Sequence, residues 1–301
     1  MSVSRRSVTA WTGLAAGACL VPIPAFAQKA ASPPAKAPDN SALSKPTFRP
    51  HKATYGLVYR LPADVNKVLD AKVRPAIKSR LALFGMTTEA ALKNMPHVTV
   101  MHIHNADPAT PAKMLAAMPK LPPPIKTSLK GYYTTEAAKG AGHPWWLDLG
   151  IPKTGDGFEN MMAFNTRATA ALCPLRDGPL PRCTGPVYAV MSDAAKELVQ
   201  TQGVSGVNVV KDGKEVRAHN PHNTLVYSMK KFEVPMQAAW NAVAEELNKI
   251  QPDGIETTFN DVSIVEIGFA GNVIREIYRI NLTDGAVLGV AGNKKLPPLK
   301  V

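Results

Sequence analysis

The chain has 301 residues, of which 45% are hydrophobic, and it carries a formal net charge of +12 at pH 7. This length and apolar content are ample for a buried core, so a wholly disordered chain is excluded. The basic balance favours anionic partners such as phosphate esters, nucleic acid or an acidic envelope surface, although solubility alone would account for it equally well. No apolar run reaches the ~20 residues needed to cross a bilayer.

The first 27 residues have the three parts of an export signal. A pair of arginines, Arg5 and Arg6, precedes a mildly apolar run that ends in Ala25-Phe26-Ala27. We predict a signal peptide over residues 1–27, similar to a twin-arginine signal, with cleavage after Ala27 and a periplasmic or secreted product. Residues 28–51 are rich in Ala, Pro, Lys and Ser without apolar periodicity, which predicts a disordered linker.

The first folded segment alternates strand and helix patterns. The spacing of apolar residues predicts a strand over 54–60, a helix over 64–84 and a strand over 98–103. Pro75 is expected to kink or divide the first helix. A second helix is predicted over 111–118, with Thr110 as its N-cap.

Residues 121–185 have weaker periodicity and are interpreted as an insertion or bridge. They contain the aromatic pairs Tyr132-Tyr133 and Trp145-Trp146, then a helix predicted near 158–172. Two nearby cysteines, Cys173 and Cys183, follow in a proline-rich loop. In an exported protein such a pair predicts a disulfide.

The second half repeats the mixed pattern of the first. It predicts strands over 187–191, 207–216 and 223–229, helices over 193–202 and 235–248, and a final hairpin of 261–269 with 273–281, turned at Gly271-Asn272. We therefore predict one α+β domain over 52–301. It would consist of two related lobes, about 52–120 and 186–301, on either side of the insertion.

One four-residue pattern occurs twice in equivalent contexts. Pro96-His97-Val98-Thr99 and Pro221-His222-Asn223-Thr224 each open a predicted strand that is followed by a helix. With only 7 His and 27 Pro in the chain, chance repetition of Pro-His-x-Thr is rare. Side chains alternate along a strand, so each His points the same way as the Thr two residues later.

Two imidazoles and two hydroxyls that meet in one cleft suit the chemistry of a phosphodiester. A neutral His can take a proton from water or a sugar hydroxyl, while a protonated His gives one to the leaving oxygen. The Thr hydroxyls can hold the non-bridging oxygens as charge develops. The sequence does not decide which His has which role.

These motifs resemble those of the 2H phosphoesterase superfamily, which includes LigT-like 2′-5′ RNA ligases and cyclic nucleotide phosphodiesterases. The resemblance implies a bilobal fold of duplicated β-α-β-α units, related by a pseudo-twofold axis, with antiparallel sheets around a central cleft. It implies His97 and His222 as catalytic residues, Thr99 and Thr224 as phosphate-binding residues, and no metal or other cofactor. The implied substrate is a small 2′,3′-cyclic-type phosphodiester or an RNA end, without an obligate protein partner.

Other residues near the motifs have alternative interpretations. His102 and His104 are expected on the face opposite His97, or beyond the strand end, where they could be a metal pair or ordinary core and surface residues. His219 could touch substrate or be a solvated loop residue. Tyr227 is expected to face away from Thr224, at an odd spacing from His222.

Further alternatives concern the aromatic and basic residues and the class of protein. The four aromatics of the insertion could stack a nucleobase, although core packing explains them as well. Arg217 and Lys230 could attract phosphate or belong to a solvated surface. The rival function is a non-catalytic periplasmic protein that binds a phosphorylated ligand, and an envelope structural protein is a third possibility.

Overall fold

The computed structural model describes residues 37–46, 53–83, 96–140, 143–228, 230–268 and 271–301. The predicted signal peptide, most of the predicted linker and Phe84 lie outside these residues. Residues 37–46 correct the linker prediction, because they include a 3-10 helix, η1 (Asn40–Ser44). The Asp39 side chain caps it by accepting from Ser41 N at 2.8 Å, and the Leu43 carbonyl accepts from Gly185 N at 2.9 Å.

The largest sheet has six antiparallel strands in the order β13-β12-β11-β10-β1-β2. The first motif therefore opens an edge strand, β2. The strands are β1 (Thr54–Arg60), β2 (His97–His104), β10 (Asp261–Ile267), β11 (Val273–Asn281), β12 (Val287–Gly289) and β13 (Lys294–Leu296). Two strands of the predicted first lobe thus share a sheet with strands of the predicted second lobe.

A second antiparallel sheet of three strands, in the order β4-β5-β8, carries the second motif on its own edge strand. Its strands are β4 (Tyr132–Glu136), β5 (Trp145–Gly150) and β8 (His222–Ser228). Two further pairs are β3 (Ile125–Leu129) with β9 (Ile255–Phe259), and β6 (Val209–Lys211) with β7 (Lys214–Val216). The expected insertion at 121–185 therefore supplies β3, which pairs with β9, and the β4–β5 pair, of which β5 pairs with β8.

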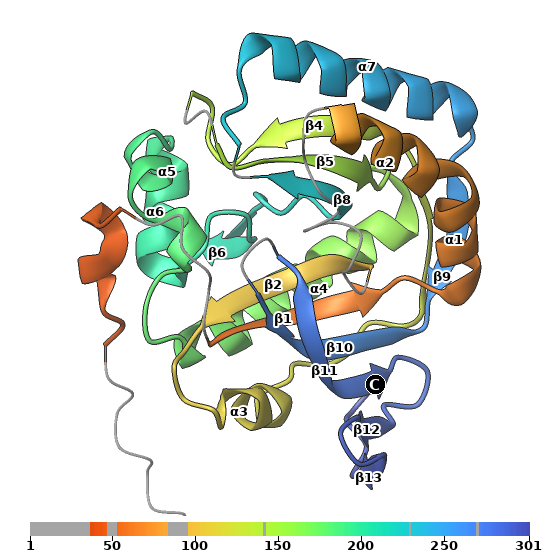
Figure 1. Cartoon of the computed structure of the whole chain (residues 1–301). Coiled ribbons are helices and arrows are strands. Elements are labelled where there is room, and N and C mark those ends of the chain that lie inside the picture. The colour runs from red at the N-terminus through yellow and green to blue at the C-terminus, as the bar shows by residue number, and fades with distance from the viewer. Residues whose placement is uncertain (1–36, 47–52, 84–95, 141–142, 229, 269–270) are drawn as a thin grey trace, which may run out of the picture. The chain divides into compact units, whose positions relative to one another are not determined.

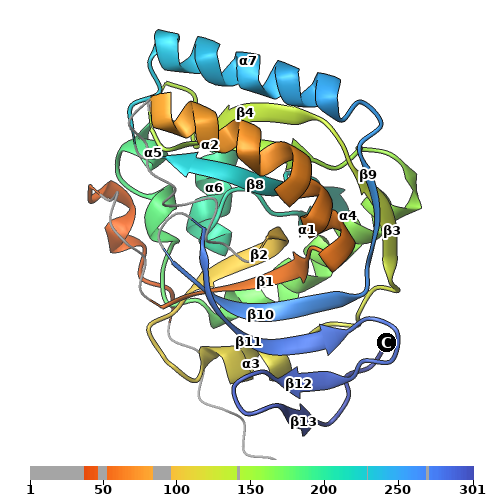
Figure 2. The same cartoon turned by 45° about the vertical axis from the view of Figure 1, so that its right-hand side comes forward.

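The helices lie around these sheets (Figures 1 and 2). They are α1 (Ala63–Val68), the π-helical turn η2 (Leu69–Val73), α2 (Arg74–Leu83), α3 (Thr110–Ala116), α4 (Gly155–Leu172), η3 (Cys173–Leu175), η4 (Pro181–Cys183), α5 (Pro186–Ala189), α6 (Asp193–Gln202) and α7 (Val234–Ile250). In both views α2 and α7 run side by side. Arg80 Nη2 of α2 lies 3.0 Å from Glu246 Oε2 of α7, and the two side chains form an ion pair. None of the helices in the described ranges is long and apolar enough to cross a membrane.

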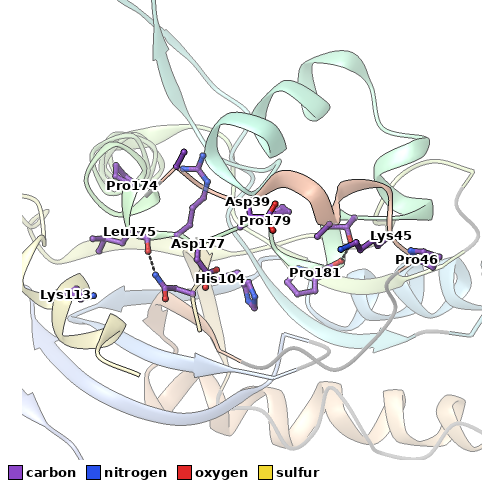
Figure 3. A pocket seen from close by; sticks show the side chains of 16 residues that line it. Asp39, Lys45, Pro46, His104, Lys113, Pro174, Leu175, Asp177, Pro179 and Pro181 are labelled. Atoms are coloured by element: carbon purple, nitrogen blue, oxygen red, sulfur yellow. Dashed lines mark hydrogen bonds between the residues drawn. The ribbon is translucent and has the colours of Figure 1, made fainter. Parts of the chain in front are cut away.

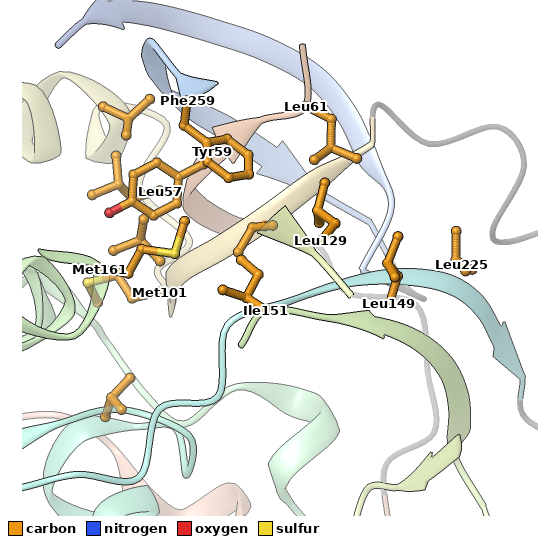
Figure 4. Close-up of a cluster of buried hydrophobic side chains, with 14 of the residues drawn as sticks. Leu57, Tyr59, Leu61, Met101, Leu129, Leu149, Ile151, Met161, Leu225 and Phe259 are labelled. Atoms are coloured by element: carbon orange, nitrogen blue, oxygen red, sulfur yellow. The ribbon is translucent and has the colours of Figure 1, made fainter. Parts of the chain in front are cut away.

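The hydrophobic core joins the six-stranded sheet to the segments around it (Figure 4). Tyr59 of β1 is fully buried, with ring centroids 5.5 Å from Phe259 of β9 and 6.2 Å from Phe164 of α4. Leu149 of β5 and Leu225 of β8 belong to the same cluster. Both motif strands are thus anchored in one continuous core, which restricts how far they can move relative to each other.

Several predicted elements are confirmed and two are wrong. The strand at 54–60 and the helix at 193–202 have the predicted bounds, and the first helix is divided by η2 just before Pro75. Thr110 is the first helical residue rather than the cap, because Ala109 occupies the N-cap position. The strand predicted over 187–191 is instead the short helix α5, which begins at Pro186, where the fixed φ of proline suits a helix start.

The predicted disulfide is absent. Cys173 and Cys183 are both free and buried, in the separate 3-10 helices η3 and η4. Burial raises the pKa of both thiols, to about 12 for Cys173. The two cysteines behave as small core residues, a common use of this side chain.

Candidate active site

The edge strands that carry the two motifs, β2 and β8, meet directly. Asn223 of the second motif donates from Nδ2 to the carbonyl of His97 at 2.9 Å. His97, Thr99, His222 and Thr224 are half-buried and alternate with buried neighbours. All four line one cavity of about 390 Å³, so the structure brings the four predicted site residues together.

Each motif strand contains a β-bulge at the same place, one residue after the motif threonine. In the pairing of β1 with β2, Val58 faces Thr99 and Leu57 faces Met101, so Val100 is the extra residue. In the pairing of β5 with β8 the extra residue is Leu225, between Thr224 and Val226. A bulge shifts the alternation of side chains by one position. The same local irregularity is therefore repeated in both halves.

The bulges correct two predictions. His102 was expected opposite His97, and Tyr227 was expected to face away from Thr224. Both instead line the cavity, because the extra residue returns the fifth position after each motif His to the motif's own face. Gly56, the strand partner of His102, leaves room for the ring, since a Cβ at Gly56 would lie 3.0 Å from His102 Cδ2.

His222 is held by its backbone surroundings in a defined orientation. Its Nδ1 lies 2.7 Å from the carbonyl oxygen of Asn220, and the Asn220 side chain donates to the Tyr133 hydroxyl at 2.9 Å. A carbonyl accepts only, so Nδ1 carries the proton of this bond. Nε2 is left for chemistry in the cavity, and it lies 3.7 Å from Oδ1 of Asp148.

Asp148 is a site residue that sequence reasoning missed. It is the strand partner of Thr224, whose hydroxyl donates to Asp148 Oδ1 at 2.9 Å, and its side chain is only 1% exposed. Burial raises the pKa of Asp148 to about 6. The charge of His222 and hydrogen bonds from Thr224, Trp146 and Thr135 act in the opposite direction. A lone acid inside the apolar run from Trp145 to Leu149 was the available signal, because unpaired carboxylates are rarely buried.

His219 lines the same cavity. Its Nδ1 lies 3.1 Å from the Gly206 carbonyl, and its backbone N–H donates to Asn208 Oδ1 at 2.9 Å. Burial lowers the pKa of His219 to about 4. The ring is therefore neutral at physiological pH, which fits a fixed hydrogen-bonding group better than a proton donor.

The aromatic pairs divide between core and cavity. Trp145 is fully buried, stacked on Phe232 at 4.5 Å and tilted against Trp240 at 5.5 Å. Trp146 stacks on Tyr227 with ring centroids 5.9 Å apart and parallel planes, and both line the cavity. Core packing accounts for the first of these tryptophans only.

The basic residues near the cavity are not those that the sequence suggested. Arg217 is paired with Glu159 at 2.8 Å and Glu215 at 2.6 Å, and neither it nor Lys230 is among the lining residues. Arg182 of η4 does line the cavity, where its charge favours an anionic ligand.

A second cavity, of about 770 Å³, lies elsewhere in the fold and contains none of the motif residues (Figure 3). It is lined by His104, whose Nδ1 is 3.4 Å from the Thr54 hydroxyl, together with Lys45, Arg176 and Asp177. His104 is thus separated from the cavity that His102 lines. In the part of the chain that the structure describes, no three His, Cys, Asp or Glu side chains are grouped to hold a metal ion.

No family model matches the sequence, and no curated protein matches it. Among solved structures, Usb1 of Kluyveromyces marxianus is similar at TM-score 0.39 and 11% identity, over 77% of this chain and 99% of that one. The same protein with uridine monophosphate gives 0.36 at 11%, over 77% and 99%, and TT0787 of Thermus thermophilus gives 0.35 at 13%, over 76% and 98%. In its antiparallel α+β fold and its two Pro-His-x-Thr strands around one cavity, the chain resembles the 2H phosphoesterases.

Proposed function

We propose that the chain is a phosphodiesterase that uses His97 and His222 as an acid-base pair. The observation that carries the proposal is the convergence of both His-x-Thr segments on one cavity of about 390 Å³. The substrate is a small cyclic phosphodiester of the 2′,3′-cyclic nucleotide type, or an RNA end. A cavity of this volume fits a compact ligand, at the lower end of the usual range of small-molecule sites.

In the proposed reaction one imidazole accepts a proton from water as the water oxygen bonds to phosphorus. The other imidazole, protonated, gives its proton to the oxygen that leaves, and each role is worth about 10²–10⁴ in rate. Thr99 and Thr224 bind the non-bridging oxygens, with Arg182 adding positive charge. Trp146 and Tyr227 supply flat apolar surfaces for a base.

Two further parts of the hypothesis concern symmetry and location. We propose that the halves carrying the motifs are related by a pseudo-twofold axis, which the repeated bulges after Thr99 and Thr224 support. We also propose export to the periplasm or exterior, which the arginine pair and the Ala25-Phe26-Ala27 site support. Amino-terminal sequencing of the protein recovered from its native host would then begin at Gln28.

The test is turnover of a panel of 2′,3′-cyclic nucleotides and short RNA ends in the presence of EDTA. Wild type should be active, and His97→Ala and His222→Ala should each be nearly inactive. The matched control is His104→Ala, since His104 belongs to the same strand as His97 but lines the other cavity. Retained activity in both single variants would refute the two-histidine mechanism. Tight binding of the nucleotides without turnover would instead identify a binding protein.

A further inference from the structure

The second motif is in contact with a carboxylate. Asp148 Oδ1 accepts the Thr224 hydroxyl at 2.9 Å and lies 3.7 Å from His222 Nε2, so one oxygen faces both functional members of the motif. A separation of 3.7 Å is too long for a hydrogen bond but is well within range for charge interaction. The Asp148 side chain is 1% exposed and the His222 side chain 26%, so water screens this interaction less than it screens a surface pair.

The orientation of His222 gives that charge interaction a defined consequence. Nδ1 is occupied by the Asn220 carbonyl, so the second proton of an imidazolium resides on Nε2, the nitrogen nearest Asp148. A buried carboxylate at this distance attracts positive charge on that nitrogen. His222 lines the cavity, where the leaving oxygen of a substrate can receive its proton.

We propose that Asp148 is a positioning residue that makes His222 the proton donor of the reaction. The inference rests on the proposed phosphodiesterase function and assigns the two roles that pseudo-symmetric motifs leave open. His97 then accepts the proton of the attacking water.

Hydrolysis of a cyclic phosphodiester then involves two proton transfers and one exchange of bonds at phosphorus. The water oxygen bonds to phosphorus while its proton moves to the His97 imidazole. The bond from phosphorus to the leaving ribose oxygen breaks, and that oxygen takes the proton from His222 Nε2. His97 ends protonated and His222 neutral, and one proton exchange with solvent restores the starting state.

Thr224 has a dual position in this arrangement. The Thr224 hydroxyl donates to the Asp148 carboxylate and stabilises this buried charge. To donate to a phosphate oxygen, the same hydroxyl must give up its bond to Asp148. The other polar and titratable groups around Asp148 are Tyr133 and Thr135 of β4 and Trp146 of β5, and His219 lies near His222. Among all these groups and His222, only His222 lowers the pKa of Asp148 through its charge, whereas Thr224, Trp146 and Thr135 lower it through hydrogen bonds.

The first experiment does not depend on activity. The Asp148 carboxyl carbon is followed by NMR against pH in the full-length protein, in His222→Gln and in His219→Gln. Wild type should titrate near pH 6, and the midpoint should rise in His222→Gln because the neighbouring positive charge is lost. The control His219→Gln should leave it unchanged. A midpoint that His222→Gln does not move would overturn the proposed pairing.

The second experiment separates the donor from the acceptor. A 2′,3′-cyclic nucleotide expels an alkoxide that needs a proton. A 2′-deoxynucleoside 3′-(4-nitrophenyl phosphate), which has no 2′-hydroxyl to replace water as the nucleophile, expels a stable phenolate that does not. His222→Ala and Asp148→Asn should lose about 10²–10⁴-fold on the cyclic substrate and far less on the aryl ester. His97→Ala should lose comparably on both.

The outcomes of the two experiments are distinct. Equal losses of Asp148→Asn on both esters, or no loss on either, would refute its role in proton donation. If wild type hydrolyses neither ester, the proposed function fails, and the NMR titration still decides whether Asp148 and His222 are coupled.

Discussion

Replacing Asp148 with Asn should make the protein more stable at neutral pH while impairing its activity. The side chain is buried, and burial raises its pKa from 3.8 to about 6. Each pKa unit corresponds to about 1.36 kcal/mol, so keeping the carboxylate ionised in the folded state costs ~3 kcal/mol. Asn has the same shape and no charge, and it keeps an acceptor oxygen for Thr224.

The sign of the pH dependence follows from the raised pKa. The folded state favours protonated Asp148, so the stability that it contributes is fully present below pH 3.8 and is lost as the pH rises through about 6. The free energy of unfolding of Asp148→Asn relative to wild type should therefore increase by ~2.5 kcal/mol from pH 4 to pH 8, since a small part of the change lies below pH 4. Comparing the two pH values cancels most effects of shape.

The assay is urea unfolding of wild type and Asp148→Asn at several pH values between 4 and 8. The control is Asp253→Asn, because the same change of side chain is made at an exposed position. A stability difference for Asp148→Asn that does not change with pH, or that changes in the opposite direction, would refute the account of a buried, destabilised carboxylate. Increased stability with reduced activity is the pattern of a residue retained for function.

Three further predictions concern the surroundings of the cavity. Gly56→Ala should lower the free energy of unfolding by ~1–3 kcal/mol, because the added methyl group crowds His102. Gly206→Ala is the control and should cost much less, because the space around Gly206 is open. Equal costs in urea unfolding would contradict this packing. Because burial lowers the pKa of His219 to about 4, stability should fall as pH drops from 6.5 toward 4, and His219→Gln should lessen that fall in unfolding measured at pH 7 and 5. Alkylation with peptide mapping should find Cys173 and Cys183 protected in the native protein and modified as thiols after denaturation without reductant, and thiols that appear only after reduction would indicate a disulfide.

The sequence located the chemically important strands because their signals are local. A Pro-His-x-Thr segment that opens a β-branched or apolar run predicts both a strand and the common face of its His and Thr, as seen for β2 and β8. The similarity of the two segments predicted that they would meet. Mixed α+β architecture also followed from alternating helix and strand periods.

The remaining features depend on pairing between distant strands. The bulges at Val100 and Leu225 are defined only by the registers of β2 with β1 and of β8 with β5, and no local pattern indicates them. Without them, strict alternation placed His102 and Tyr227 on the wrong face. Asp148 is 76 residues from Thr224 in sequence, so its contact required the pairing of β5 with β8, which the weak pattern of residues 121–185 did not indicate.

The most direct test of the central claim is a double-mutant cycle on one 2′,3′-cyclic nucleotide. Turnover is measured for wild type, His97→Ala, His222→Ala and the double variant, with circular dichroism to verify folding. If the two histidines act as a unit on the same phosphodiester, each single variant should lose most of the activity, and the double variant should be little worse than either. Near-wild-type turnover in either single variant, or losses that multiply in the double variant, would contradict a shared acid-base mechanism.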